Sequence, residues 1–260
     1  MDLIAIKLFV TPALMLAVTL AANRWGSFVG GVLAGMPLTS GPILLYLTIE
    51  QGPGFAANAA SGTTTGIASA LVSYLAYGVI SAYAGRVISA GAMLAAYFAA
   101  ARSMMAAPSY LQTWTVILSA LGCIFFLTRN TRRSADSALS PAWDLPARIF
   151  ASTAIVFFVT TSARALGAEW SGIFTPIPVI AWPLIVFVHA QRGRPDCLAV
   201  LRGTAAGSVA TLAFCTIVRQ YIDHLPAAQV FLMATMAAAA TSILSALALI
   251  QHQMRVDQSR

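Results

Sequence analysis

The chain has 260 residues, of which 59% are hydrophobic and 9% are charged, with a mean hydropathy of +0.80 and a formal net charge of +7. A soluble domain carries about 25% charged residues, so the composition excludes a soluble globular protein and predicts a polytopic membrane protein. The positive charge does not indicate nucleic-acid binding, because the arginines stand at the ends of apolar segments, as cytoplasmic loops require. Only short loops separate these segments, which leaves no room for a soluble catalytic domain.

Taken in chain order, the apolar runs predict an all-α fold with nine transmembrane helices. The first run, 8–22, looks like the apolar part of a signal peptide, but an equivalent run at 149–163 lies in mid-chain, so we expect a true first helix. The nine expected ranges are 4–22, 27–49, 56–80, 84–101, 112–128, 148–165, 170–190, 198–221 and 228–250.

The two halves of the chain are similar in sequence. Residues 7–80 align without a gap to residues 148–221, and 14 of the 74 pairs are identical, whereas this composition gives about six by chance. Half of the identities are Gly or Pro, which constrain the backbone. We therefore predict two four-helix repeats, residues 1–104 and 148–260, joined by residues 105–147, which contain one linker helix and a cytoplasmic loop.

The positive charges predict how the chain crosses the membrane. One set of loops carries eleven Lys and Arg residues and the other set carries four. The positive-inside rule places the first set in the cytoplasm, with the N-terminus outside and the C-terminus inside. Because five helices precede the second repeat, that repeat enters the membrane in the opposite sense to the first. The repeats are therefore expected to be inverted.

A local pattern in the first repeat is similar to a known family. Lys7 opens the first helix, Ala-Ala-Asn-Arg follows at 21–24, and Gly-Gly-Val-Leu-Ala-Gly-Met-Pro-Leu-Thr occupies 30–39. This pattern resembles the GlpM/YdgC family of small four-helix proteins of the bacterial inner membrane. A weaker version runs from Arg148 to Pro178 in the second repeat.

The resemblance implies that the chain is a fusion of two such units through one extra helix, located in the bacterial inner membrane. Family members are regarded as dual-topology proteins that pair antiparallel, and the family name carries a link with alginate production. The second repeat departs from the pattern, since Ala34-Gly35 becomes Thr175-Pro176 and Thr39 becomes Ile180. The two halves are therefore expected to have specialised.

The second helix of each repeat is the first candidate site. Pro37 and Pro42 recur as Pro178 and Pro183, and each proline removes a backbone donor and displaces the carbonyl four residues earlier. At membrane depth such carbonyls must face protein or a water-lined cavity. The alternative is that the prolines only kink the helices for packing. The carbonyls concerned are those of Leu33, Leu38, Phe174 and Val179, with the hydroxyls of Thr39, Ser40 and Ser171 nearby.

The third helix of each repeat is the second candidate site. Both contain GxxxG, at 62–66 and 203–207, and this motif favours close helix packing over ligand binding. The hydroxyls of Thr63 and Thr64 in the first repeat are kept in part in the second, as Thr204 and Ser208.

The ionisable residues narrow the function further. No Asp or Glu falls in the middle of an expected span, which argues against a proton-coupled exporter of cations. Lys7, Arg148 and Arg202 lie near helix starts, and they are either interfacial side chains or charge gates for an anionic substrate. His189 stands alone at a helix end and is expected to be interfacial.

No enzymatic pattern is present. The three histidines and three cysteines have no metal-ligand spacing, and no phosphate-binding Gly loop occurs outside the spans. We therefore expect no metal, no cofactor and no catalytic residues.

These observations favour a transporter or exporter of a small neutral or anionic solute, in which inverted repeats give alternating access. The alternative is a non-transporting accessory protein for envelope polysaccharide or lipid assembly. The expected partners are the lipid bilayer and an unidentified small molecule, without nucleic acid, and a homodimer is compatible with the sequence. The expected substrate-binding residues are Pro37, Thr39, Ser40, Pro42, Thr63, Thr64, Pro178, Pro183, Thr204 and Ser208.

Overall fold

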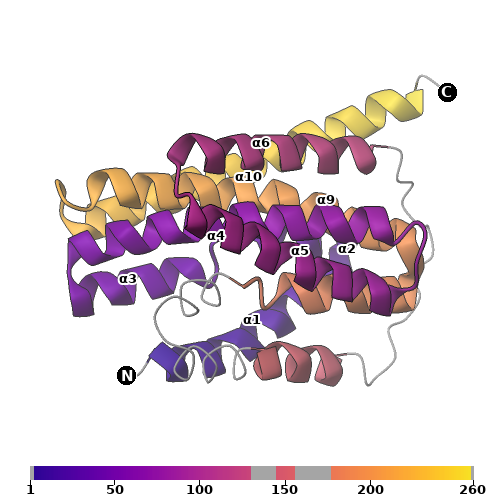
Figure 1. The fold of residues 1–260 in the computed structure, drawn as a ribbon, viewed down its shortest axis with the longest axis horizontal. Helices are drawn as coiled ribbons and strands as arrows, with labels where there is room; N and C mark the ends of the chain where they lie inside the picture. Colours follow the sequence, from indigo (N-terminus) through magenta and orange to yellow (C-terminus); the bar gives the residue numbers. More distant parts are fainter. Residues whose placement is uncertain (1–2, 130–144, 156–176, 259–260) are drawn as a thin grey trace.

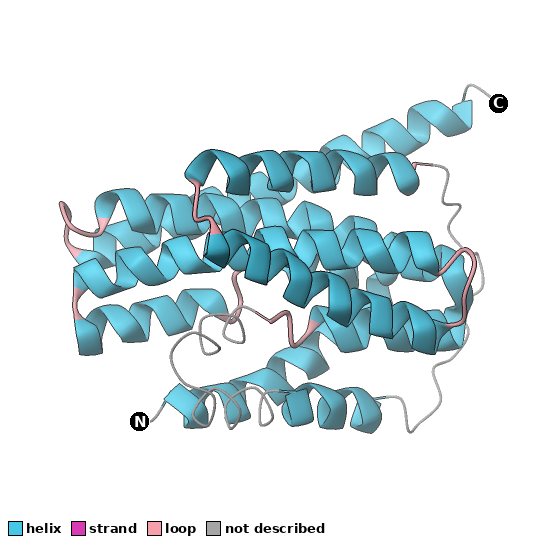
Figure 2. Ribbon diagram, in the orientation of Figure 1, coloured by secondary structure: helices cyan, strands magenta, loops and turns pink. Residues whose placement is uncertain are grey.

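The computed structural model describes residues 3–129, 145–155 and 177–258, and within these ranges the chain is helical apart from short turns (Figure 2). The helices pack side by side along the long axis of the molecule (Figure 1). In chain order they are α1 (Leu3–Trp25), α2 (Ser27–Gly35), α3 (Ser40–Gln51), α4 (Pro53–Ile80), α5 (Arg86–Ala106), α6 (Tyr110–Leu127), an unlabelled helix Leu145–Ile155, α9 (Ala181–Tyr221) and α10 (Ala227–Gln258).

Six apolar stretches in the described ranges are long enough to cross a membrane, with α2 and α3 counted together as 27–49. The prediction of an all-helical protein is therefore confirmed for the described residues, and the length and apolar composition of these stretches support a place in the membrane. The observed α4, α5, α6 and α10 agree with their expected ranges to within a few residues at their starts. Residues 156–176, which include parts of the sixth and seventh expected spans, lie outside the described residues.

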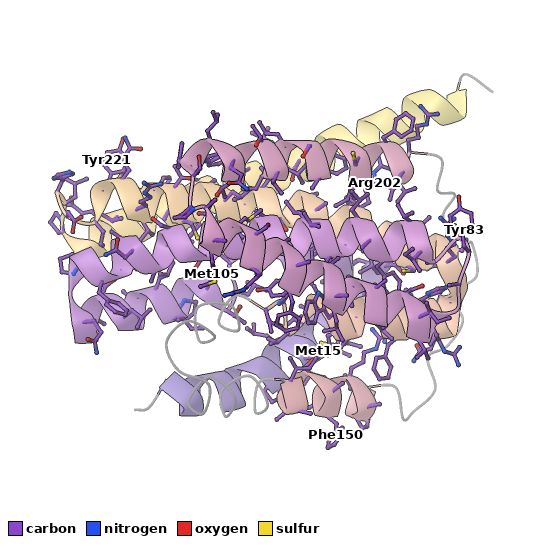
Figure 3. The ribbon with its side chains drawn as sticks, in the orientation of Figure 1. Met15, Tyr83, Met105, Phe150, Arg202 and Tyr221 are labelled. Carbon is purple, nitrogen blue, oxygen red and sulfur yellow. The ribbon has the colours of Figure 1, made fainter. Side chains whose placement is uncertain are left out.

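The bundle has two ends, which we name after the glycines at their turns. At the Gly52 end, α3 meets α4 and α9 meets α10, and at the Gly193 end α1 meets α2 and α4 meets α5 (Figure 1). Figure 3 marks Tyr221 at the first end and Tyr83 at the second. The chain runs along α4 from the Gly52 end to the Gly193 end, whereas it runs the other way along the part of α9 that follows Gly193 (Figure 1).

Two glycines with positive φ turn the chain back at opposite ends of the bundle. Gly52 separates α3 from α4 with φ 88° and ψ 169°. Gly193 interrupts α9 with φ 81° and ψ −177°, so α9 consists of two helices. Glycine adopts this region without steric cost. The expected boundary between helices 170–190 and 198–221 is thus a single glycine and not a longer loop.

A second type of break interrupts the helix before each of these glycines. Between α2 and α3 the amide of Leu38 donates to the carbonyl of Met36 at 2.8 Å, and before α9 the amide of Val179 donates to the carbonyl of Ile177 at 2.9 Å. These bonds stand 141 residues apart, the offset of the sequence alignment. Two further pairs of backbone hydrogen bonds follow the same offset. The bond from the Gly41 amide to the Pro37 carbonyl corresponds to that from Trp182 to Pro178. The bond from the Ile43 amide to the Thr39 carbonyl corresponds to that from Leu184 to Ile180.

The closest helix contact joins α2 to the second part of α9. A Cβ added at Gly31 would lie 3.0 Å from the Thr204 amide nitrogen, and one added at Gly35 would lie 2.9 Å from that of Ser208. A Cβ at Gly203 would lie 2.9 Å from the Val32 nitrogen. Because residue numbers rise together along both helices, α2 and this part of α9 run in the same direction. The predicted close packing at 203–207 is confirmed, whereas the same prediction for 62–66 is wrong at Gly62, where a Cβ would meet nothing within 4 Å.

Candidate functional site

The two helix breaks meet at a cavity of about 520 Å³. Residues 33–36 and 38–40 contribute from the end of α2 and the break after it, and residues 177–181 from the break before α9. The cavity extends along α4 from Phe55, beside the Gly52 end, as far as Tyr74. Among the described lining residues Phe55 and Gly62 are exposed, and Phe55 lies beside the Gly52 end.

The cavity wall is mostly aliphatic, with a few hydroxyl groups. The described lining contains no Lys, Arg, Asp, Glu or His side chain. Its hydroxyl-bearing residues are Thr39, Ser40, Thr63, Tyr74, Ser208 and Thr211. An apolar wall with a few convergent polar groups is typical of a site for a small organic molecule, and the volume lies in the range of about 300–1,000 Å³ found for such sites.

The breaks leave backbone groups at the cavity wall. The carbonyl of Gly35, at the end of α2, accepts a hydrogen bond from Oγ1 of Thr211 at 2.7 Å. The carbonyl of Leu33 accepts from the amide of Met36 at 3.2 Å. Within the described ranges no hydrogen bond reaches the carbonyls of Leu38 and Val179, which the prolines four residues later displace.

Five of the ten expected substrate-binding residues line this cavity. They come from four different stretches of the chain: the break before α3, α4, the break before α9, and α9 itself. The hydroxyls of Thr63 and Ser208 also bond to the carbonyls one turn earlier in their own helices, at 2.9 Å and 2.8 Å. The five are Thr39, Ser40, Thr63, Pro178 and Ser208.

The other five lie elsewhere. Pro37 stands in the break but not on the wall, and Pro42 is exposed in the first turn of α3. Pro183 is buried in the first turn of α9. Thr204 lies in the α2–α9 contact, where its hydroxyl bonds to the carbonyl of Val200 at 2.9 Å. Thr64 faces a different cavity, between α4, α6 and α9.

Of the three expected charge gates, Arg148 and Arg202 do not line the 520 Å³ cavity. Arg148 is buried, and its Nη2 donates to Oε1 of Gln191 at 3.3 Å. Arg202 is 4% exposed in the second part of α9 (Figure 3), where its Nε has no hydrogen-bond partner among the described residues. The side chain of Lys7 lies outside the described residues, as do Ser171 and the Phe174 carbonyl.

Polar contacts join α9 to other helices at the Gly193 end. Nδ1 of His189 lies 2.9 Å from the Tyr77 hydroxyl of α4, so this histidine does not stand alone. Nη2 of Arg194 donates to the carbonyl of Gly78 at 3.3 Å. Three further contacts reach α1, α2 and α4: Arg192 to Asn23 at 2.8 Å, Ser27 to Asp196 at 2.9 Å, and Arg194 to Ser81 at 3.3 Å.

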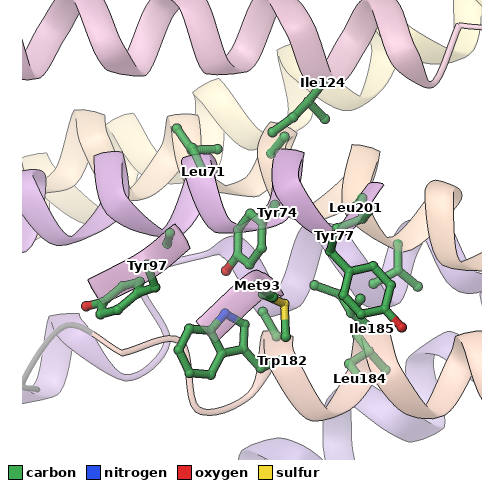
Figure 4. Close-up of a cluster of buried hydrophobic side chains, with 14 of the residues drawn as sticks. Leu71, Tyr74, Tyr77, Met93, Tyr97, Ile124, Trp182, Leu184, Ile185 and Leu201 are labelled. Carbon is green, nitrogen blue, oxygen red and sulfur yellow. The ribbon is translucent and has the colours of Figure 1, made fainter. Parts of the chain in front are cut away.

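Large buried side chains fill the space between the cavity and this polar end (Figure 4). Nε1 of Trp182 donates to the Ser73 hydroxyl at 3.4 Å, and the Trp182 ring meets that of Tyr97 edge to face at 5.3 Å. Tyr74 and Tyr77 of α4 lie in the same cluster. The cavity is therefore closed toward the Gly193 end.

The Gly52 end differs from the Gly193 end in its polar contacts. Residues 48–55, at this end, align with residues 189–196 of the second repeat. Among their described side chains, the only hydrogen bond is that of Thr48 to the Leu44 carbonyl within α3, at 2.8 Å. The polar contacts between helices are thus concentrated at the closed end of the cavity.

Sequence reasoning missed the residues whose partners are distant in the chain. Thr211, Tyr74 and the pair formed by Tyr77 and His189 carry no motif. The only signal for His189 was its place one turn before a glycine that aligns with Gly52. No group of three or more His, Cys, Asp or Glu residues is arranged to hold a metal within the described ranges.

Comparison with protein-family models, with curated proteins and with solved structures gives no match for this chain.

Proposed function

We propose that the protein is a transporter of the bacterial inner membrane that moves a small solute by alternating access between two inverted four-helix repeats. The observation that carries the proposal is the pairing of the two helix breaks. Both have the same backbone hydrogen bonds at an offset of 141 residues, and both contribute to one cavity. Discontinuous helices that meet at a site between repeats are typical of secondary transporters.

The inversion is supported by helix direction. In the first half, α2 and α4 run in opposite directions, since the chain turns back at Gly52 (Figure 1). The second part of α9 is the counterpart of α4, yet it runs parallel to α2. The counterpart of α4 therefore points opposite to α4, as an inverted repeat requires. Nine spans with residues 112–128 as the linker account for this arrangement.

The membrane orientation is supported by the arginines. Arg86, Arg129 and Arg194 lie at the Gly193 end, and the Gly52 end carries fewer basic residues (Figure 1). We infer that the Gly193 end is cytoplasmic, which places the N-terminus outside and the C-terminus inside.

The cavity favours a neutral solute over an anionic one. No charged side chain is among its described lining residues, and Arg148 and Arg202 do not reach that wall. An uncompensated charge in such a wall would lose its hydration without a partner. We therefore propose a largely apolar solute with a few hydroxyl or carbonyl groups, which Thr39, Ser40 and Thr63 would bind.

The α2–α9 contact changes the expected mechanism. Rocking one whole repeat against the other would separate helices whose backbones touch at Gly31 and Gly203. We propose instead that α2 and the second part of α9 form the static centre. The moving elements are α3 with its Gly52 turn and the first part of α9 with its Gly193 turn. The structure then corresponds to the state open at the Gly52 end.

Alternating access can be tested without knowing the solute. Cys123, Cys197 and Cys215 are replaced by alanine, and Thr63→Cys is introduced into the cavity wall. A membrane-impermeant maleimide is then applied to intact cells and to inverted vesicles. Tyr83→Cys at the Gly193 end and Leu225→Cys at the Gly52 end serve as controls, each of which should react from one side only.

A transporter should expose Thr63→Cys to both sides, with faster reaction from the side on which Leu225→Cys reacts. An accessory protein without transport would expose this position to one side or to neither. Reaction from a single side over long exposure would therefore reject the transporter proposal and favour a role in envelope polysaccharide or lipid assembly.

A further inference from the structure

A second cavity, of about 280 Å³, lies on the side of the bundle between α4, α6 and α9. It shares no lining residue with the 520 Å³ cavity. Each of its lining side chains carries at least one polar atom, which is unusual on the flank of an apolar bundle. These residues are Thr64, Tyr110, Trp114, Thr216, Arg219 and Gln220.

The charged group in this cavity is the guanidinium of Arg219. Its Cζ lies 5.1 Å from the centre of the Tyr110 ring, and within the described part of the chain it has no hydrogen bond or ion pair. Asp223 follows one turn later, but its Oδ1 lies 3.9 Å from the position that a Cβ on Gly54 would take, beside the start of α4. The donors of Arg219 thus remain available to a ligand.

Trp114 supplies a second donor. Its indole Nε1 is buried and has no acceptor among the described residues. The nearby hydroxyls of Thr64 and Thr216 donate to carbonyls of their own helices, those of Ala60 at 3.1 Å and Leu212 at 2.8 Å. A buried N–H without an acceptor is costly, and a ligand oxygen would remove that cost.

The location of the cavity suits the membrane surface. Tyr110 is the first residue of α6, and Arg219 lies two residues before the end of α9, at the Gly52 end marked by Tyr221 (Figure 3). The side chains of Tyr110 and Leu111 are 62% and 72% exposed on the outer flank of the bundle. Aromatic residues gather at this depth in membrane proteins, beside the lipid headgroups.

We propose that this cavity binds a phosphate group, carried by a phospholipid headgroup or free in solution. Arg219 would hold two of its oxygens in a bidentate contact, and Nε1 of Trp114 would donate to a third, with the Gln220 amide at the rim. A phosphate group, which is rich in acceptors, matches a cavity whose charged group and whose buried N–H are both donors. The site is independent of the proposed transport cavity, and its test does not depend on transport.

The test uses the full-length protein, delipidated in dodecyl maltoside and titrated with dioctanoyl phosphatidylglycerol, with native mass spectrometry as the readout. The variants are Arg219→Gln, Trp114→Phe and the control Arg102→Gln, which removes the same charge from an exposed position on α5. We expect Arg219→Gln to weaken binding about tenfold and Trp114→Phe to weaken it about threefold, and Arg102→Gln to bind as the wild type does.

Two further ligands identify the source of the phosphate. Dioctanoylglycerol, which has the chains without the phosphate, should bind weakly and equally to all variants. Excess inorganic phosphate will displace the lipid if the site takes the free ion, and will leave it bound if the site takes a headgroup. Equal lipid affinity in Arg219→Gln and Arg102→Gln, or equal affinity of the wild type for the two lipids, would overturn the proposal.

Discussion

The contact between α2 and the second part of α9 predicts an unusually large effect of one methyl group. A Cβ at Gly203 would fall on the carbonyl oxygen of Phe28 and would lie 2.9 Å from the amide nitrogen of Val32. Both obstacles are backbone atoms, so no side-chain rotation relieves the overlap. We therefore expect Gly203→Ala to force the two helices apart along their whole contact.

The size of the effect follows from two opposing contributions. Overpacking of a tight contact costs about 1–3 kcal/mol, and weakening the Cα–H···O contacts between the two backbones adds about 0.5–1 kcal/mol each. Alanine gains about 1 kcal/mol over glycine in helix propensity. The net expectation for Gly203→Ala is a loss of about 1–3 kcal/mol in the free energy of unfolding.

The assay is unfolding in mixed micelles of dodecyl maltoside and sodium dodecyl sulfate, followed by circular dichroism. Gly122→Ala is the matched control, because Gly122 lies in the middle of α6 and a Cβ there meets nothing within 4 Å. This control should be neutral or more stable. If Gly203→Ala and Gly122→Ala agree within about 0.5 kcal/mol, the helices do not touch as described and the reasoning is refuted.

Three further predictions concern the breaks and the closed end. Thr211→Val should lower the free energy of unfolding by about 1–2 kcal/mol, because the Gly35 carbonyl loses the hydroxyl that bonds to it at 2.7 Å. Thr235→Val, on the exposed side of α10, should change the free energy of unfolding little in the same assay. Gly52→Ala and Gly193→Ala should each cost about 1–3 kcal/mol in the free energy of unfolding, because both glycines combine positive φ with ψ near 180°, a region essentially restricted to glycine. A neutral result at either position would show that this turn is not formed. Tyr77→Phe removes the hydrogen bond with His189 and should speed maleimide labelling of Thr63→Cys from the Gly193 end. The control Tyr83→Phe, at an 87% exposed position, should leave the labelling rate unchanged. Equal labelling rates in the two variants would contradict a role of this hydrogen bond in closing the cavity.

Sequence alone predicted the features that depend on backbone chemistry. Pro37 and Pro178 cannot donate a hydrogen bond, so the helix breaks beside them could be located from the residue types and their repetition. Gly52 and Gly193 align with each other, and both have positive φ at a turn, as Gly26 between α1 and α2 also does. The GxxxG motif at 203–207 correctly indicated a close helix contact.

The partners of these features could not be predicted, because they depend on packing between distant segments. The motif at 203–207 did not reveal that Gly31 and Gly35 of α2 are its partners. Arg148 was expected to be a snorkelling residue at a helix start, yet it is buried, and its guanidinium contacts Gln191 and lies 5.8 Å from the centre of the Phe187 ring. The fold class could thus be predicted from the sequence, whereas the assignment of wall residues to one cavity required the structure.

The central claim is that the two halves lie in the membrane in opposite senses, and the turns at Gly52 and Gly193 test it most directly. Gln51→Cys and Ala190→Cys, both at exposed positions next to these turns, are made separately in a protein without native cysteines. Each is labelled with an impermeant maleimide in intact cells and in inverted vesicles. The account predicts that Gln51→Cys reacts in intact cells and Ala190→Cys reacts in inverted vesicles. Reaction of both from the same side would contradict the inverted arrangement and, with it, alternating access between the halves.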